Sequence, residues 1–240
     1  MNLHIFEKGF NYSQDGPGNR LVYHLCGCNF RCPWCSNPEG LFGKGKTVTT
    51  EAVVREIVSA RPMFFDGGGV TFTSTGGECS LQADALLAVI AEVKQAGVHV
   101  AIESNAATAD FLRLATACDT VIADYKHPDA AVLREVTGGE LDVIERNLLT
   151  LAAQREIHLR IPLIHGFNDD AAATDGFLRF FSRLPRDRFD LEILPYHEYG
   201  KDKWHKLGHA YTVTDGAVTP ACVQSLTDAM QSIGVRVVRT

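Results

Sequence analysis

The chain has 240 residues, of which 45% are hydrophobic and 22% are charged, a composition typical of a soluble globular protein. Its 23 Lys and Arg residues against 29 Asp and Glu residues give a net charge of −6, which argues against a protein that wraps nucleic acid or attaches to an anionic membrane. The N-terminus lacks the apolar core of a signal peptide, and no run approaches the roughly 18 apolar residues of a membrane-spanning helix. We therefore expect a cytoplasmic protein.

Apolar, β-branched runs alternate with amphipathic helical runs from Leu21 onward. In chain order, strands are expected at Leu21–Cys26, Val70–Thr73, His99–Glu103, Thr120–Asp124, Ile157–Ile164 and Phe189–Leu194. Helices are expected at Thr50–Ala60, Leu81–Ala96, Ala109–Ala115, Leu141–Ala153, Ala171–Arg183 and Pro220–Ile233, and a last short strand at Val235–Val238. Without repeats or long linkers, the simplest prediction is one domain over residues 1–240, with a core at about 15–200 and a C-terminal helix and strand at about 220–239.

About six βα units in a row predict a parallel sheet, either barrel-like or doubly wound. The unusual residues follow the expected strands. They are the cysteine loop, Gly76-Gly77-Glu78, Glu103-Ser104-Asn105, Asp124-Tyr125-Lys126, His165 to Asp170, and Pro195-Tyr196-His197. In α/β barrels the active site is built from loops at the carboxyl ends of the strands, so these residues are expected to converge on one face.

Four of the seven cysteines lie between Cys26 and Cys35. Such clustering, in a chain with no export signal, favours a metal site over disulfides. Cys28, Cys32 and Cys35 have C-x3-C-x2-C spacing, and three thiolates on one loop can hold an iron–sulfur cube with one iron left open. Cys26 could act as a fourth ligand and give either a closed cluster or a zinc site made of four cysteines, although zinc knuckles usually pair two C-x2-C units. At this point both kinds of metal site remain open.

The loop resembles the radical S-adenosylmethionine (SAM) motif, including an aromatic residue, Trp34, before the last cysteine. The resemblance implies a partial (β/α)6 barrel in a single radical SAM domain, and one [4Fe–4S] cluster whose open iron chelates SAM. Gly76-Gly77-Glu78 resembles the GGE motif of this family, which contacts the methionine part of SAM. Glycines let the backbone approach a ligand closely, and a carboxylate can receive its ammonium group.

Further segments resemble the glycyl-radical-enzyme activating enzymes, especially those of the pyruvate formate-lyase type. These segments are Asp15-Gly16-Pro17-Gly18-Asn19-Arg20, Asp124-Tyr125-Lys126, the run Arg160 to Asp169, and the run Leu194 to Lys201. They occur in the family's order, from about Phe6 to Trp204. Singly, each has an ordinary explanation as a turn or a solvated side chain. Their joint order at strand ends is what carries the resemblance.

The resemblance also implies roles for particular residues, with no catalytic residue beyond the cluster and SAM. The cofactor-binding residues are Trp34, Cys35 and Ser36 on the adenosine side, and Gly76, Gly77, Glu78, Asp124, Tyr125, Lys126, Arg160 and His197 on other parts of SAM. Glu103 and Ser104 match the positions beside which the family's site can hold a monovalent cation. Asp15, Gly16, Pro17, Gly18 and Arg20 match the segment that contacts the partner protein.

Residues 36–69 contain no cysteine, so the additional clusters that many of these activating enzymes carry are not expected. Cys79, Cys118 and Cys222 are expected to be buried, inert thiols. The expected activity is removal of a hydrogen atom from a glycine of a partner glycyl radical enzyme under anaerobic conditions, with reduced flavodoxin or ferredoxin as electron donor. The alternatives are a radical SAM enzyme that acts on a small molecule or nucleoside, and a zinc-binding or electron-transfer module. Metal analysis distinguishes the zinc-binding module from the radical SAM enzymes, because only the zinc-binding module would contain zinc at full occupancy and no sulfide.

Overall fold

The computed structural model describes residues 1–42, 45–73 and 77–239. The chain forms two compact units, and each draws on several segments. The first unit comprises Met1–Asn29, Cys35–Ser104 and Thr108–Ile122, and the second comprises Phe30–Trp34, Asn105–Ala107 and Ala123–Thr240.

The strands of the first unit are β1 (Asn2–Tyr12), β2 (Asn19–Leu25), β3 (Lys46–Thr49), β4 (Gly69–Thr73), β5 (His99–Ser104) and the beginning of β6 (Thr120–Asp124). Their order is β3-β1-β2-β4-β5-β6. β1 pairs antiparallel with β2 and β3, whereas β2, β4 and β5 are parallel, with Val70 opposite Leu21 and Val100. Every residue of β4 is buried, as expected for a central parallel strand.

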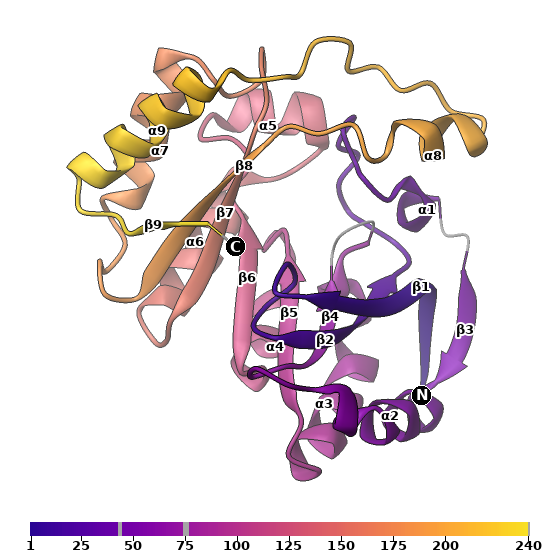
Figure 1. The fold of residues 1–240 in the computed structure, drawn as a ribbon. Helices are drawn as coiled ribbons and strands as arrows, with labels where there is room; N and C mark the ends of the chain where they lie inside the picture. The colour runs from indigo at the N-terminus through magenta and orange to yellow at the C-terminus, as the bar shows by residue number, and fades with distance from the viewer. Residues whose placement is uncertain (43–44, 74–76, 240) are drawn as a thin grey trace. The chain divides into compact units, whose positions relative to one another are not determined.

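The helices of the first unit are α1 (Pro38–Leu41), α2 (Thr50–Ser59), α3 (Ala83–Gln95) and α4 (Phe111–Ala117), with two 3-10 helices, η1 (Arg61–Met63) and η2 (Cys79–Gln82). α2 begins at Thr49, whose hydroxyl accepts a hydrogen bond from the Ala52 amide at 3.2 Å. α3 buries an apolar stripe that includes Leu86, Val89 and Val93. Figure 1 shows α2 and α3 side by side.

The second unit contains the end of β6, then β7 (Ile157–Leu163), β8 (Phe189–Pro195) and β9 (Val237–Val238), in the order β6-β7-β8-β9. β7, β8 and β9 are parallel. Its helices are α5 (Ala130–Thr137), α6 (Leu141–Ala152), α7 (Ala171–Phe181), α8 (Lys201–Lys206) and α9 (Pro220–Ser232). α7 and α9 contact each other (Figure 1).

The predicted α/β class with mostly parallel strands is confirmed, and the six main strands and six helices agree with the expected ranges within two residues at each end. The elements β1, β3, α1, α5 and α8 were not predicted, and β9 is shorter than expected. β1 lacks an apolar run, because most of its residues are exposed or half-buried. No helix in the described ranges is long and apolar enough to cross a membrane.

Candidate active site

The cysteine loop leaves the end of β2 in the first unit. The Gly27 amide donates to the Gly40 carbonyl at 2.8 Å, and the Gly27 carbonyl accepts from the Glu78 amide at 2.7 Å. Gly27 has a φ of 89°, a left-handed conformation that favours glycine. The first turn of the loop is therefore tied directly to the segment that carries the GGE motif.

The middle of the loop, Phe30–Trp34, belongs to the second unit. Phe30 is buried, and its ring packs so closely on Gly139 that a Cβ at that glycine would lie 2.5 Å from it. The Arg31 amide donates to the Thr137 carbonyl at 2.8 Å. Trp34 packs on Phe167 with a centroid distance of 4.6 Å. Three separate contacts therefore anchor this short segment.

The donor set of the loop fits an iron–sulfur cluster. Cys28, Cys32 and Cys35 supply three cysteine side chains, and thiolates are the usual ligands of such clusters. The three thiols are divided between the units, and within neither unit do the described residues group three metal-ligating side chains. Cys26 is buried against Gly45, where a Cβ would lie 2.3 Å from its sulfur. The ligand set Cys28, Cys32 and Cys35 remains a prediction.

The predicted GGE motif follows β4 in the sequence, and its first glycine, Gly76, lies outside the described residues. Gly77 passes so close to β2 that a Cβ would lie 1.8 Å from the Leu25 carbonyl oxygen. Glu78 is fully buried. Its Oε1 accepts hydrogen bonds from the Ser80 amide at 3.0 Å, the Ser80 hydroxyl at 2.6 Å and the Ser104 hydroxyl at 2.7 Å. The structure thus brings Glu78 and Ser104, two predicted site residues, into direct contact.

Glu103, the residue matched to a cation position, is also buried. Its Oε2 accepts a hydrogen bond from the Thr73 hydroxyl at 2.6 Å. The Cys79 thiol lies 3.3 Å from the Glu103 carbonyl oxygen, and burial, followed by the charge of Glu78, raises the pKa of this thiol well above its usual value. Cys79 and Cys118 are buried as expected, whereas Cys222 is half-buried.

In the second unit, the Asp124-Tyr125-Lys126 segment follows the end of β6. The Lys126 ammonium and an Asp124 carboxylate oxygen are 2.5 Å apart, and both side chains are largely buried. Tyr125, between them, is 1% exposed and stacks on Phe180 at a centroid distance of 4.2 Å. Its hydroxyl donates to Glu145 at 2.8 Å. The side chain of Tyr125 therefore serves the aromatic core, where alternation along the chain turns it away from Asp124 and Lys126.

We expect Tyr125→Phe to lower the free energy of unfolding by about 1 kcal/mol, because one buried hydrogen bond is lost. The midpoint of thermal unfolding should fall by about 2–4 °C, and the dissociation constant for SAM should not change. Thermal melts and equilibrium binding on the same preparation check both expectations. Weaker SAM binding at unchanged stability would instead place the Tyr125 hydroxyl at the ligand.

Arg160 lies on β7 and has a buried partner that the sequence analysis did not identify. Its Nε donates to Glu192 Oε2 at 2.9 Å, and the register of β7 and β8 sets these two residues opposite each other. His158, opposite Asp190, bonds to Asp190 and lies 3.4 Å from Glu192. The alternation of polar residues at 158, 160, 190 and 192 was a visible signal that two neighbouring strands share a charged face.

The last predicted site residue of this unit, His197, follows β8 and is exposed. Its ring stacks on Tyr199 with a centroid distance of 4.1 Å, and its Nδ1 accepts a hydrogen bond from the Tyr199 amide at 3.4 Å. Cys35 and Ser36 are half-buried in the first unit. The structure thus pairs Glu78 with Ser104 in the first unit and Asp124 with Lys126 in the second.

The Asp15–Gly18 turn precedes β2, so it lies at the opposite end of that strand from the cysteine loop. Arg20 is fully buried beneath the turn. Its guanidinium donates to the Pro17 carbonyl at 2.9 Å, the Thr71 hydroxyl at 2.6 Å and the Val70 carbonyl at 2.6 Å. Burial lowers the pKa of Arg20 to about 10, against the opposing charge of Asp15. Asp15 and Gly18 are also buried, so Pro17 is the exposed residue of the turn.

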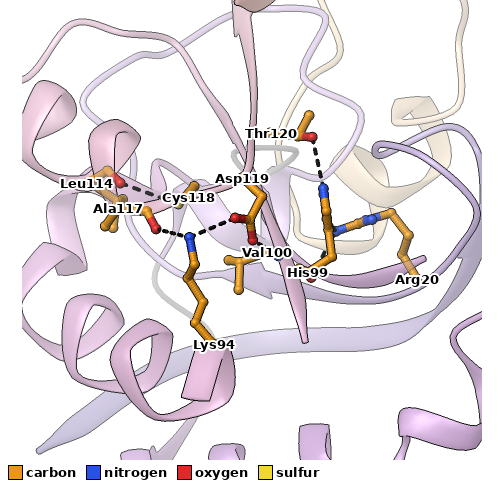
Figure 2. Close-up of polar contacts among 9 residues, drawn as sticks. All are labelled: Arg20, Lys94, His99, Val100, Leu114, Ala117, Cys118, Asp119 and Thr120. Carbon is orange, nitrogen blue, oxygen red and sulfur yellow. Dashed lines mark hydrogen bonds and ion pairs between the residues drawn. The ribbon is translucent and has the colours of Figure 1, made fainter. Parts of the chain in front are cut away.

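The buried Arg20 is joined to His99 at the start of β5 (Figure 2). Their nitrogens Nη2 and Nδ1 are 3.2 Å apart, and the Thr120 hydroxyl lies 3.3 Å from His99 Nε2. A guanidinium only donates hydrogen bonds, so His99 Nδ1 must accept and the ring must be neutral, with its proton on Nε2. Burial, reinforced by the charge of Arg20, lowers the pKa of His99.

A lowered folded-state pKa means that unfolding allows His99 to take up a proton. Its contribution to stability is therefore complete above the unfolded pKa of about 6.5 and is lost as the pH falls from there through the folded pKa. We expect His99→Gln to flatten the acid side of a stability–pH curve measured by urea unfolding. His158→Gln is the control. Burial lowers the pKa of His158, but hydrogen bonds to Asp190 and Glu192 outweigh burial and raise this pKa. The stability that His158 contributes is therefore lost as the pH rises through its folded pKa, so His158→Gln should change the alkaline side of the stability–pH curve.

Comparisons with known proteins point to one superfamily. Residues 22–178 match the model of the radical SAM superfamily. The pyruvate formate-lyase-activating enzyme of Staphylococcus aureus strain USA300 is 32% identical over 213 residues, which cover 84% of each chain. Among solved structures, a domain of the pyruvate formate-lyase-activating enzyme from Bacteroides vulgatus ATCC 8482 has a TM-score of 0.57 and 24% identity, covering 69% of this chain and 96% of that one.

A radical SAM methyltransferase from Sphaerobacter thermophilus has a TM-score of 0.66 at 15% identity, covering 96% of this chain and 72% of that one. Identities this low show the fold, and the predicted partial (β/α)6 type is confirmed in this way. With its cysteine loop inside the matched residues and 32% identity to an activating enzyme over 84% of its length, this chain belongs to the radical SAM superfamily.

Proposed function

We propose that this chain is an activating enzyme that cleaves SAM reductively and generates a glycyl radical on a partner enzyme. The observation that carries the proposal is the 32% identity, over 84% of both chains, to a protein named as the activating enzyme of pyruvate formate-lyase. Membership of the radical SAM superfamily implies a [4Fe–4S] cluster and SAM as cofactors. Cys28, Cys32 and Cys35 are the proposed cluster ligands.

When bound, the cluster supplies the electron that splits SAM into methionine and a 5′-deoxyadenosyl radical, which removes a hydrogen atom from the partner's glycine. The protein's own residues bind and orient SAM. We assign Glu78 and Ser104 to the methionine part, with Gly77 giving the backbone close access. Asp124, Lys126, Arg160 and His197 are further proposed contacts. Trp34, Cys35 and Ser36 are assigned to the adenosine part, and a monovalent cation beside Glu103 and Ser104 belongs to the same proposal.

The proposed contact with the partner centres on the turn Asp15–Gly18. Arg20 is fully buried and so has no surface that a partner can touch. It contributes by holding the Pro17 carbonyl, while the exposed Pro17 offers the contact. β2 has 7 residues, so a partner that touches both this turn and the cysteine loop must extend about 23 Å along the strand. An extended polypeptide loop has that reach. Flavodoxin or ferredoxin is the proposed electron donor.

The decisive experiment is anaerobic reconstitution with iron and sulfide, followed by SAM, a reductant and a glycyl radical enzyme. We expect 5′-deoxyadenosine together with an electron paramagnetic resonance signal on the partner. The signal should disappear when the partner's radical-site glycine is replaced by alanine. Deoxyadenosine without a partner signal, across several candidate partners, would favour a small-molecule substrate. Stoichiometric zinc without sulfide would contradict both the glycyl radical activity and a radical SAM activity on a small molecule.

A further inference from the structure

Asn168 makes three buried hydrogen bonds between two loops of the second unit. The residue is 1% exposed. Its Oδ1 accepts from the Ile164 amide at 2.8 Å. Its Nδ2 donates to the carbonyl oxygens of Lys126 and Pro162, each at 2.8 Å. Both donor hydrogens and one acceptor site of the amide are thus used, and all three partners are main-chain groups.

These bonds fix the main chain of Lys126 to the end of β7. One residue earlier, the Tyr125 amide donates to the Arg160 carbonyl at 2.8 Å. The segment that carries the Asp124–Lys126 ion pair is therefore attached to β7 at two consecutive residues, through Arg160 and through Asn168. The ion pair itself is short, at 2.5 Å, and largely buried. A side chain held in this way loses little further freedom when a ligand binds.

The neighbouring residue in the same turn, Phe167, packs on the cysteine loop through Trp34 and on the segment after β6 through His127. Its ring lies 4.6 Å from the Trp34 ring and 4.9 Å from the His127 ring. His127 follows Lys126 and is buried. Two adjacent residues of one turn thus contact the segment after β6 from two directions, by hydrogen bonds and by ring packing.

We propose that Asn168 is a positioning residue that preorganises Lys126 and Asp124 for SAM. The inference rests on the proposed function, in which these two residues contact SAM. Asn168 itself acts only through the main chain of Lys126. Residues that orient the ligands of a metal in this way typically change its affinity by about 10–100-fold when removed, and we expect the lower end of that range for SAM.

The test is SAM binding by the anaerobically reconstituted protein, measured at equilibrium. We expect Asn168→Ala to raise the dissociation constant about tenfold, while the iron content stays unchanged. Asp129→Ala is the matched control, because the Asp129 carboxylate lies in the same connection and caps α5 by accepting from the amides of Ala131 and Val132. It should lower stability but leave the dissociation constant within about twofold, since a cap accounts for about 1 kcal/mol of stability.

A double-mutant cycle with Lys126→Met separates positioning from general destabilisation. If Asn168 acts through Lys126, Asn168→Ala should weaken binding by less than about twofold in the Lys126→Met background. Equal effects of Asn168→Ala in both backgrounds would overturn the inference, as would an unchanged dissociation constant or an equal effect of Asp129→Ala. If Asn168→Ala does not fold, Asn168→Ser is measured under the same criteria. Failure of the unaltered protein to bind SAM would instead contradict the proposed function.

Discussion

Replacing Cys32 by serine should abolish SAM cleavage and remove most of the bound iron and sulfide. Three thiolates are the minimum that holds a four-iron cube with one iron open, so the loss of one leaves too few ligands. Cys28→Ser and Cys35→Ser should behave in the same way. The measurements are iron and sulfide per chain after anaerobic reconstitution, the visible absorption of the cluster, and deoxyadenosine release.

Two further cysteine variants provide the controls. Cys222 is half-buried, like Cys28 and Cys35, but lies in α9. Cys222→Ser should retain iron, sulfide and activity. Cys26→Ala tests the fourth-ligand alternative, because Cys26 is buried against Gly45. Retention of a functional cluster in that variant is expected. If Cys26→Ala lost its metal as completely as Cys32→Ser does, a four-thiolate site would replace the present ligand set.

Gly77→Ala should be among the most destabilising single substitutions in this chain. The added Cβ would stand 1.8 Å from the Leu25 carbonyl oxygen and 2.6 Å from its carbon, and both are main-chain atoms that cannot rotate away. Overpacking typically lowers the free energy of unfolding by about 1–3 kcal/mol, and a clash with main chain belongs at the upper end. For a chain of this size, about 3 kcal/mol corresponds to a fall of about 6–12 °C in the unfolding midpoint.

Gly9→Ala is the matched control, since nothing lies within 4 Å of a Cβ at that position. It should be neutral or slightly stabilising, because alanine restricts the unfolded chain. Gly77→Ala should also weaken SAM binding, since Glu78 follows directly and its hydrogen bonds to Ser80 and Ser104 depend on the local backbone. The unfolding midpoints of both variants are measured by calorimetry, and their dissociation constants for SAM by equilibrium binding. Equal melting points for the two variants would show that β2 and the motif can move apart at little cost.

Local patterns predicted the parallel strands because each carries a contiguous apolar run that a buried sheet requires. β6 was predicted at its observed bounds, Thr120–Asp124. β1 was missed because it is held in the sheet by antiparallel pairing with β2 and β3 on its two sides, and its exposed residues show no such run. α5 was missed as well, although Asp129 caps it and Gly138 ends it in a left-handed conformation. An N-cap aspartate followed nine residues later by a glycine is a pattern that predicts a short helix between them.

By itself, the sequence determined the cysteine loop, the order of the motifs and their places at strand ends. These features are local, because ligand spacing and strand periodicity are properties of short segments. Only the tertiary structure decided which groups meet. Arg20 was predicted to contact the partner protein but is fully buried, because its hydrogen-bond acceptors Val70 and Thr71 lie on β4, 50 and 51 residues further along the chain. Glu192 and Asn168 likewise gained their roles from partners that β-sheet register and loop contact supply. A residue's type fixes what it can bond to, and the fold fixes which partner is within reach.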